Sequence, residues 1–475
     1  MNNAVPIARD TALDEDTWGG PAPSGPTPFI REPRDRSVYL TVRFKFLIAL
    51  SVATVWCALS VWLSQPWIRD LAGAVGWPLS IFLITFIAYV PGFMNAFLIT
   101  TIGLDRRPRR RPLECYPDIS ILVACYNEAE NIADTIASLA MQNYPGRMQV
   151  LILDDGSTDD TTGVARVAIA ACQQRPGRNF RIVEGGCNIG KAGVLNRGLA
   201  LSAAEIVLTI DGDCWVYEDA VQRLVERYRS DPVETRAVAG AILVSNSRQN
   251  WLTKAQEWDY FHGIAAVKRM QSMYHGTLVA QGAFSLYDRA ALNEVGGWPA
   301  CVGEDIVVTW ALLERGYRVG YCEDAIAFTN VPEEFKVFAQ QRKRWSRGLM
   351  EAFKLHGGLL FKPRLTTLFV WWNLFFLPLD LVYTFAFIPG LVLALFGYYY
   401  LAGILTLLVL PLAALWNYCI FLVQNKMFKR QDLKVRRNTG GFLFYVLGYS
   451  LLMQPVCVWG YVAELLGMSK RWGTK

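Results

Sequence analysis

At 475 residues the chain is long enough for more than one folded unit, and its 53% hydrophobic content and positive mean hydropathy indicate a membrane protein. The net charge of +6 is modest and the arginines cluster beside apolar stretches, which is typical of topology signals and argues against nucleic-acid binding. The ten cysteines show no CxxC or Cys/His ligand spacing, which argues against a structural zinc site and a secreted disulfide framework.

The chain begins with a polar segment and two membrane-length stretches. Residues 1–37 are rich in proline, glycine and charge, which predicts a flexible N-terminal tail. Within 38–104, two apolar stretches at about 44–64 and 76–101 are each long enough to cross a hydrocarbon core of ~30 Å as helices. Basic residues precede the first stretch and follow the second, so the positive-inside rule places both flanks in the cytoplasm.

Residues 112–332 alternate short β-rich runs with amphipathic helical runs. This alternation predicts a cytoplasmic α/β domain with a doubly wound, mostly parallel sheet, inserted between transmembrane helices. Asn127 and Ser157 each have an acidic residue three positions later, and these capping patterns predict the starts of the first two helices. Ligands of such sheets bind beyond the carboxyl ends of the strands.

The remaining chain returns to apolar sequence. Residues 333–365 mix aromatic, aliphatic and basic residues, which predicts amphipathic helices at the membrane interface. Residues 366–468 contain about three further transmembrane helices. That count leaves the basic C-terminal end outside, against the usual bias, unless the region of Pro378 and Pro389 forms two short or re-entrant passes, so the number of passes stays open.

A pair of aspartates suggests a metal site. Asp211 and Asp213 flank a glycine directly after a predicted strand, so both carboxylates can converge on one hard cation. Mg²⁺ or Mn²⁺ there would bridge a diphosphate, whose oxygens complete the coordination shell. The alternative is a surface turn, because aspartate and glycine are favoured in turns.

Other residues at predicted strand ends are suited to a nucleotide. Asp154 and Asp155 can bond to a base or ribose, or form a turn and helix cap. Tyr126 can lie against a base or pack in the core. Lys191 follows a glycine in a loop that enters a helix, where backbone N–H groups and an ammonium can face phosphate.

Two downstream clusters are suited to sugar transfer. Glu304 and Asp305 open a predicted helix, where one carboxylate can accept the proton of an attacking sugar hydroxyl. The alternative is that the two acids only stabilise the N-terminus of the helix through its dipole. Gln341, Arg344 and Trp345 combine donors for phosphate with an indole for a sugar face. Taken alone, that cluster is also compatible with a basic interfacial helix.

The order of these groups resembles the processive membrane-bound family 2 glycosyltransferases, such as cellulose, chitin and hyaluronan synthases, and is closest in type to the bacterial poly-N-acetylglucosamine synthases. The resemblance covers about residues 115–350, and QRxRW is its most specific part. It rests on four groups: Asp155, Asp211-x-Asp213, Glu304-Asp305 and Gln341-Arg342-x-Arg344-Trp345. It implies a GT-A domain on the cytoplasmic side of a bacterial inner membrane.

The resemblance also implies roles for individual residues. Asp155, with Asp154, would hold the uridine moiety, and Lys191 would lie near the diphosphate. Asp213, assisted by Asp211, would bind the metal. Asp305 would be the base of a single inverting displacement that gives a β linkage. The remaining implied positions are diphosphate and acceptor contacts by Gln341, Arg344 and Trp345, and an approach to the acceptor at Gln281 and Gly282.

The implied activity is the polymerisation of a UDP-sugar, with UDP-N-acetylglucosamine favoured over UDP-glucose. The growing polysaccharide would be the acceptor, the membrane helices would export it through the lipid bilayer, and a small membrane partner subunit that completes the channel is a further hypothesis. The alternatives are transfer of one sugar to a lipid, a hyaluronan-like synthase of a two-sugar copolymer, and a membrane scaffold without turnover.

Overall fold

The computed structural model describes residues 40–469 except 107–109, 173–175 and 430–434. The predicted tail of residues 1–37 lies outside the described residues. The described residues from Thr41 onward form one unit by their contacts.

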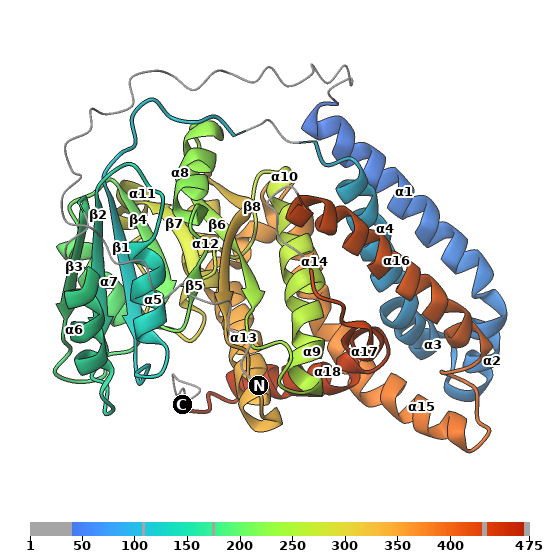
Figure 1. Ribbon diagram of the computed structural model, residues 1–475. Helices are drawn as coiled ribbons and strands as arrows, with labels where there is room; N and C mark the ends of the chain where they lie inside the picture. The colour runs from blue at the N-terminus through green and yellow to red at the C-terminus, as the bar shows by residue number, and fades with distance from the viewer. Residues whose placement is uncertain (1–39, 107–109, 173–175, 430–434, 470–475) are drawn as a thin grey trace. The chain divides into compact units, whose positions relative to one another are not determined.

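The part of the chain between the long apolar helices folds around a sheet with both parallel and antiparallel strands (Figure 1). Its eight strands lie in the order β3-β2-β1-β4-β7-β6-β8-β5. They are β1 (Ile119–Cys125), β2 (Met148–Asp154), β3 (Arg178–Val183), β4 (Ile206–Asp211), β5 (Trp215–Val216), β6 (Thr235–Val244), β7 (Phe284–Asp288) and β8 (Arg318–Thr329). Neighbours among β1 to β4 are parallel, as are β6 and β8, whereas β7 is antiparallel to β4 and β6, and β5 to β8. The predicted α/β class with a mostly parallel sheet is confirmed.

The parallel register places the predicted site residues at one edge. Cys125 of β1 pairs with Asp154 of β2, and Ala124 pairs with Asp211 of β4. Every residue of β1 is buried, as expected for a central parallel strand covered on both faces. The segments that follow β1, β2 and β4 therefore leave the sheet side by side.

Helices surround the sheet, and the first two begin later than the capping patterns predict. They are α5 (Ile132–Ala140), α6 (Thr161–Cys172), α7 (Lys191–Leu201), α8 (Ala220–Ser230), α9 (Trp251–Trp258) with the π-helix η2 (Asp259–Ala266), α10 (Val267–Met273), α11 (Arg289–Glu294) and α12 (Glu304–Glu314). The predicted caps are wrong because Asn127 and Ser157 form hydrogen bonds between the loops after β1 and β2. Asn127 has a φ of 55°, its N–H donates to Ser157 Oγ, and its Oδ1 accepts from the N–H of Thr158.

Residues 333–365 form the single helix α13 (Phe335–His356) and a short 3-10 turn, η3 (Gly357–Phe361). Helix α13 packs along α12 and along α18 (Ser450–Leu465) near the C-terminus. It therefore connects the sheet domain with the last long apolar helix.

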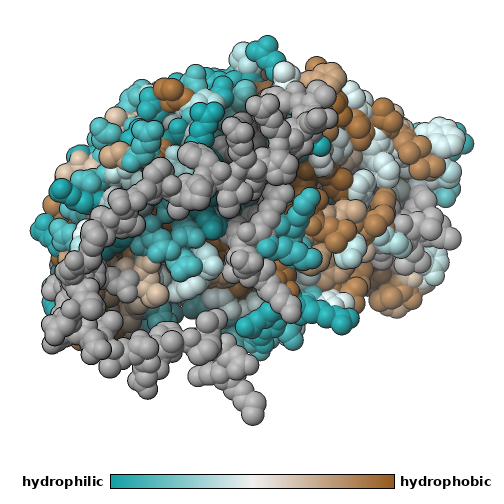
Figure 2. Space-filling model, turned by 45° about the horizontal axis from the view of Figure 1, so that its top comes forward, coloured by the Kyte–Doolittle hydropathy of each residue, from teal (hydrophilic) through white to brown (hydrophobic). Residues whose placement is uncertain are grey.

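Among the described residues, four helical runs are long and apolar enough to cross a membrane: Val42–Leu63, Trp77–Gly103, Thr367–Leu395 and Thr439–Leu465. Figure 2 shows hydrophobic residues gathered on the side that bears the long helices and hydrophilic residues over the sheet. The runs are built from α1 (Val42–Leu63); α3 (Trp77–Ile84), η1 (Thr85–Tyr89) and α4 (Val90–Gly103); α14 (Thr367–Val382), η4 (Tyr383–Phe387) and α15 (Ile388–Leu395); α17 (Thr439–Phe444), η5 (Tyr445–Tyr449) and α18. They indicate a membrane protein.

Two further helices lie in the apolar parts of the chain, one before and one after the sheet domain. Helix α2 (Gln65–Val75) lies between the two apolar stretches predicted at about 44–64 and 76–101. Helix α16 (Ile404–Lys429) contains a shorter apolar stretch, Pro411–Val423. The region of Pro378 and Pro389 is one continuous run of 29 residues rather than two short passes. The predicted domain boundaries remain predictions.

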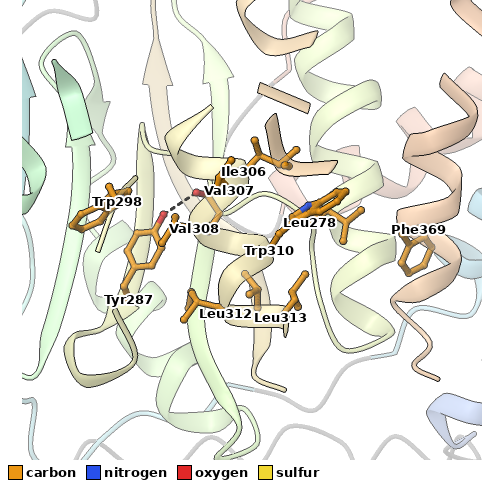
Figure 3. Packing of buried hydrophobic residues seen from close by; sticks show 14 of the residues in the cluster. Leu278, Tyr287, Trp298, Ile306, Val307, Val308, Trp310, Leu312, Leu313 and Phe369 are labelled. Carbon is orange, nitrogen blue, oxygen red and sulfur yellow. Dashed lines mark hydrogen bonds between the residues drawn. The ribbon is translucent and has the colours of Figure 1, made fainter. Parts of the chain in front are cut away.

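One hydrophobic cluster joins the sheet domain to the long helices through α12. The rings of Phe97 and Phe369, from two of the membrane-length runs, lie 5.6 Å and 6.0 Å from that of Tyr274. Figure 3 shows Tyr287 and Trp298 on one side of α12 and Phe369 on the other. Because the body of α12 is packed from both sides, its first turn is held in a fixed place.

Candidate active site

Three charged side chains from distant parts of the sequence meet at the carboxyl edge of the sheet. Lys191, the first residue of α7, forms an ion pair with Asp211 at the end of β4. Its Nζ also lies 3.7 Å from Oε1 of Glu304, the first residue of α12. Lys191 and Glu304 are only 8% and 7% exposed. A buried ammonium between two carboxylates is an arrangement that an incoming anion or cation would reorganise.

The charges of this cluster depend on one another. Burial lowers the pKa of Lys191, but the carboxylates of Asp211 and Glu304 raise it by more, so its pKa lies above the usual range and it stays protonated. Burial raises the pKa of Glu304; Lys191 opposes this effect and Asp305 adds to it. Arg344 of helix α13 also lowers the pKa of Glu304.

We expect Glu304 to make the stability of the protein depend on pH. The ordinary pKa of this carboxyl is 4.5 and the folded state raises it, so above about pH 4.5 the folded chain holds a proton that the unfolded chain has lost. The contribution of Glu304 to stability is therefore lost as the pH rises through the raised pKa. Midpoints of thermal inactivation measured from about pH 5 to about pH 8 should fall less steeply for Glu304→Gln than for the wild type. Parallel profiles would contradict this assignment.

Asp305 lies beside Glu304 in the first turn of α12 but is half-buried rather than enclosed. Its Oδ1 accepts a hydrogen bond from the N–H of Ile306 at 2.8 Å, and its backbone carbonyl accepts from Thr309 Oγ1 at 2.6 Å. One of the two adjacent carboxyl groups is thus committed to Lys191, while the other is more open to solvent.

Close backbone contact holds α13 against this turn. Gly303 precedes α12, and a Cβ on it would lie 2.4 Å from the Cα of Gly348 in α13. Oε2 of Glu351, also in α13, accepts hydrogen bonds of 2.9 Å from the N–H groups of Val302 and Gly303. Arg344, one turn before Gly348, is thereby placed near Glu304.

The predicted metal ligands lie at the end of β4. Asp213 is half-buried, and its Oδ2 accepts a hydrogen bond of 3.4 Å from Thr329 Oγ1 at the end of β8. Asp211 is bound to Lys191. The two carboxylates stand one residue apart at the edge where the ammonium lies.

The carboxylates predicted to bind a nucleotide are bonded to the backbone. Asp154 accepts from the N–H groups of Gly156 and Ser157 at 3.1 and 3.2 Å, and is 4% exposed. Asp155 accepts from the N–H groups of Ile189 and Gly190 at 2.7 and 3.0 Å. Burial raises the pKa of Asp155, although these hydrogen bonds oppose the rise. Asp155 therefore anchors the loop that precedes Lys191.

The remaining predicted residues lie around the charged cluster. Tyr126 is half-buried just beyond β1. Nε2 of Gln281 donates to the carbonyl of Gly240 at 2.6 Å. Gly282 presents backbone to the cluster, because a Cβ there would lie 2.8 Å from Nζ of Lys191. Only glycine leaves the ammonium its present position.

Helix α13 supplies the predicted phosphate and acceptor contacts. Oε1 of Gln341 is buried and has no hydrogen-bond partner within the described residues. Arg344 is half-buried, and Trp345 is 39% exposed. An exposed indole and an unsatisfied amide oxygen beside a guanidinium are suited to a polar ligand with a sugar face.

Comparison with known proteins identifies the domain. Residues 120–296 match the model of glycosyl transferase family 2. Over these residues the chain is similar to glycosyl transferase family 2. The resemblance to family 2 that the motifs indicate is confirmed over these residues, and QRxRW lies beyond them.

Two curated relatives are similar to just over half of the chain. The poly-β-1,6-N-acetyl-D-glucosamine synthase of Staphylococcus epidermidis is 30% identical over 277 residues, which cover 56% of this chain and 65% of that protein. The enzyme of the same name from Staphylococcus aureus strain COL is 31% identical over 274 residues, covering 55% and 64%. The chain thus matches less than two thirds of the length of these relatives.

A solved mannosyltransferase from Pyrobaculum calidifontis, in complex with GDP-Man and Mn²⁺, shares the fold. Its TM-score is 0.55 at 20% identity, and the match covers 82% of this chain and 99% of that one.

Sequence reasoning misses the structural role of Arg342. This residue of QRxRW is 3% exposed, with NH2 2.8 Å from Oδ2 of Asp259 and 3.0 Å from the hydroxyl of Tyr449. Its guanidinium carbon lies 4.1 Å from the ring centroid of Trp345. The first arginine of the motif therefore braces the tryptophan. A sequence signal for this role is Asp259, an acid between the aromatic residues Trp258 and Tyr260.

Sequence reasoning also passes over Lys268 of α10. It is 7% exposed, and its Nζ donates to the carbonyl of Val279 at 2.5 Å. Burial lowers its pKa to about 7, although Asp305 acts in the opposite direction. Lys268 fixes the strand-like segment that leads to Gln281 and Gly282.

Proposed function

We propose that the protein is a membrane-bound inverting β-glycosyltransferase that polymerises a UDP-sugar into an exported polysaccharide. The observation that carries the proposal is the convergence of Lys191, Asp211 and Glu304-Asp305 beside the QRxRW helix, within a family 2 domain flanked by membrane-length helices. UDP-N-acetylglucosamine is the first donor to test and UDP-glucose the second, in keeping with the two poly-N-acetylglucosamine synthases that the chain resembles.

In the proposed reaction Asp305 accepts the proton of the acceptor hydroxyl as that oxygen attacks C1 of the donor sugar. The bond from C1 to the diphosphate breaks on the opposite face, so the configuration inverts and UDP leaves with the bonding electrons. Lys191 and Arg344 lie where positive charge would stabilise the leaving diphosphate. The exposed face of Trp345 would support the acceptor sugar.

Asp211 and Asp213 fit a divalent cation that shares its shell with a ligand. Among the described residues no group of three or more His, Cys, Asp or Glu could hold a metal by itself. Two hard carboxylates nevertheless suit Mg²⁺ or Mn²⁺ when diphosphate oxygens complete the shell. A cation held there would neutralise charge on the departing diphosphate.

Removing one proposed metal ligand should lower the affinity for the metal more than it lowers the stability of the fold. For Asp213→Asn in the presence of UDP we expect Mn²⁺ affinity at least about tenfold below that of the wild type, measured by the paramagnetic resonance of free Mn²⁺. Asp134→Asn, an exposed acid in the first turn of α5, is the matched control and should bind Mn²⁺ as the wild type does. Equal affinity in all three proteins would remove Asp213 from the metal site.

The function itself is tested by product analysis. The full chain in lipid nanodiscs with Mg²⁺ or Mn²⁺ is offered UDP-sugars singly and in pairs, and UDP release is recorded together with product mass. A high-mass product from one donor supports the proposal and names the sugar. A product that requires two donors indicates a copolymer synthase, and a single glycolipid indicates transfer to a lipid acceptor. If UDP is released from none of the donors, the proposal is contradicted for the chain acting without a partner subunit.

The proposal also assigns a location. The arginines after the second membrane-length run support a sheet domain on the cytoplasmic side by the positive-inside rule. The proposed membrane is the inner membrane of a bacterium. A growing chain would then pass from the edge of the sheet, past Trp345, toward the helices that α13 contacts. A small partner subunit could complete that path, and co-purification from its native membrane would reveal it.

A further inference from the structure

A cavity lies away from the charged cluster of the candidate active site. Its volume is about 700 Å³, within the range of ligand-binding sites. Its wall includes four side chains that are cationic at neutral pH and one carboxylate, Glu234. The four cations are Arg43, Arg318, Lys362 and Arg364. Such an excess of positive charge around a hollow is expected to attract an anion.

Two of these arginines are uncommitted. Within the described part of the chain Arg43 and Arg318 form no salt bridge, and no side-chain hydrogen bond of either is found. Each guanidinium therefore keeps its fork of donors, the geometry that suits the oxygens of a phosphate. Both are also close enough to His275 to lower its pKa, after the larger effect of burial, so the histidine stays neutral and can donate one hydrogen bond.

The other two cations are fixed in place by the backbone. Nζ of Lys362 donates to the carbonyl of Glu314 at 2.9 Å, and Arg364 donates through one nitrogen to the carbonyl of Leu313 at 2.7 Å. These carbonyls end helix α12. Since each cation uses only part of its donors there, the rest remain available at a preorganised position.

The backbone beside the cavity is strained. His275 has a φ of 80°, and among the described residues only Asn127 is another non-glycine residue with a positive φ. This conformation is uncommon for a residue with a side chain, and such strain is commonly kept at functional sites. The turn presents His275 to the same cavity as the arginines.

The position of the cavity indicates the kind of anion. Arg43 is the second residue of the run Val42–Leu63, and Thr367, also in the wall, is the first of Thr367–Leu395. Two membrane-length helices therefore begin at the cavity, and their positive dipole ends add to its field. This is the level at which phospholipid headgroups lie.

We propose that this cavity binds a phosphate ester, and that anionic phospholipid headgroups and soluble organophosphates are its two sources. Charge, donor geometry and volume suit the phosphate group itself, and Leu365 and Leu368 in the wall suit the start of an acyl chain. The site is distinct from the proposed donor site, since none of its lining residues belongs to the cluster around Lys191.

The test measures binding and needs no sugar transfer, so its failure is separate from failure of the proposed function. The full chain is placed in phosphatidylcholine nanodiscs with increasing phosphatidylglycerol, and retained lipid is counted by native mass spectrometry. In detergent, inorganic phosphate and pyrophosphate are titrated by calorimetry. The double variant Arg43→Gln/Arg318→Gln is compared with Arg166→Gln/Arg229→Gln, which removes the same charge from two partly exposed ion pairs elsewhere.

Saturable binding by the wild type, at least about tenfold weaker in the cavity variant and unchanged in the control, supports the proposal. Binding of phosphatidylglycerol without phosphate or pyrophosphate identifies the lipid as the source, and the reverse identifies a soluble organophosphate. The conservative variant Arg318→Lys should retain part of the binding if the variant is folded. No binding of any probe by the wild type, or equal losses in both double variants, overturns the proposal.

Discussion

Replacing Asp305 by asparagine should reduce the rate of sugar transfer by about 10²–10⁴-fold, the range that general base catalysis contributes. Asparagine keeps the size of the side chain and an oxygen that can accept from the N–H of Ile306, so α12 should keep its first turn. Donor binding should therefore change little. The measurement is kcat from UDP release, together with the Kd of the donor from calorimetry.

Glu304 is the internal comparison for this prediction. Because it is 7% exposed and bound to Lys191, its replacement by glutamine should alter donor binding and stability as well as rate. Glu314→Gln, at the other end of the same helix, controls for a change of charge. If Asp305→Asn turned over at more than a tenth of the wild-type rate while Glu304→Gln did not, the base would be Glu304.

The fold could be predicted because its signals are local. Each central strand is a short apolar run that ends in a polar group, and the parallel register of β1, β2 and β4 then brings those ends to one edge. The grouping of Asp155, Asp211 and the segment after β1 follows from this register. It could be inferred without knowing any side-chain contact.

The side-chain partners could not be predicted in the same way. Asn127 and Ser157 have the spacing of helix caps, but they bond across two loops that only the sheet brings together. Lys191 is predicted to face phosphate, yet its first partners are carboxylates from β4 and α12. Spacing along the chain reports neighbours within one helix, whereas these contacts join elements more than ten residues apart.

Helix α2 and the buried Lys268 show a second limit. Helix α2 spans 11 residues of mixed polar and apolar sequence. A stretch of that length between two strongly apolar stretches is interpreted as a connection. Lys268 sits in a short helix after an aromatic stretch, where a lone lysine normally indicates an exposed face. Only the packing of α10 on β8 and α4 shows that it is enclosed.

The last prediction concerns the buried arginine of QRxRW. Arg342→Ala would leave Asp259, 7% exposed, without its cation, and would remove the guanidinium that stacks on Trp345. Breaking a buried ion pair in this way costs about 3–5 kcal/mol of the free energy of unfolding. We expect a clear drop in the midpoint of thermal inactivation in nanodiscs, whereas Lys343→Ala, the next residue, should change it little.

A double variant separates the two roles that Arg342 could have. Arg342→Met/Asp259→Leu replaces both charges by apolar groups, which restores much of the stability if the arginine acts as a brace, because no uncompensated charge remains. If Arg342 instead bound the diphosphate, the single variant would lose donor affinity at unchanged stability and the double variant would not recover. The structure favours the brace, since Asp259, Tyr449 and the indole of Trp345 already surround the guanidinium. Of the two arginines in the motif, Arg344 is then the one left to meet the substrate.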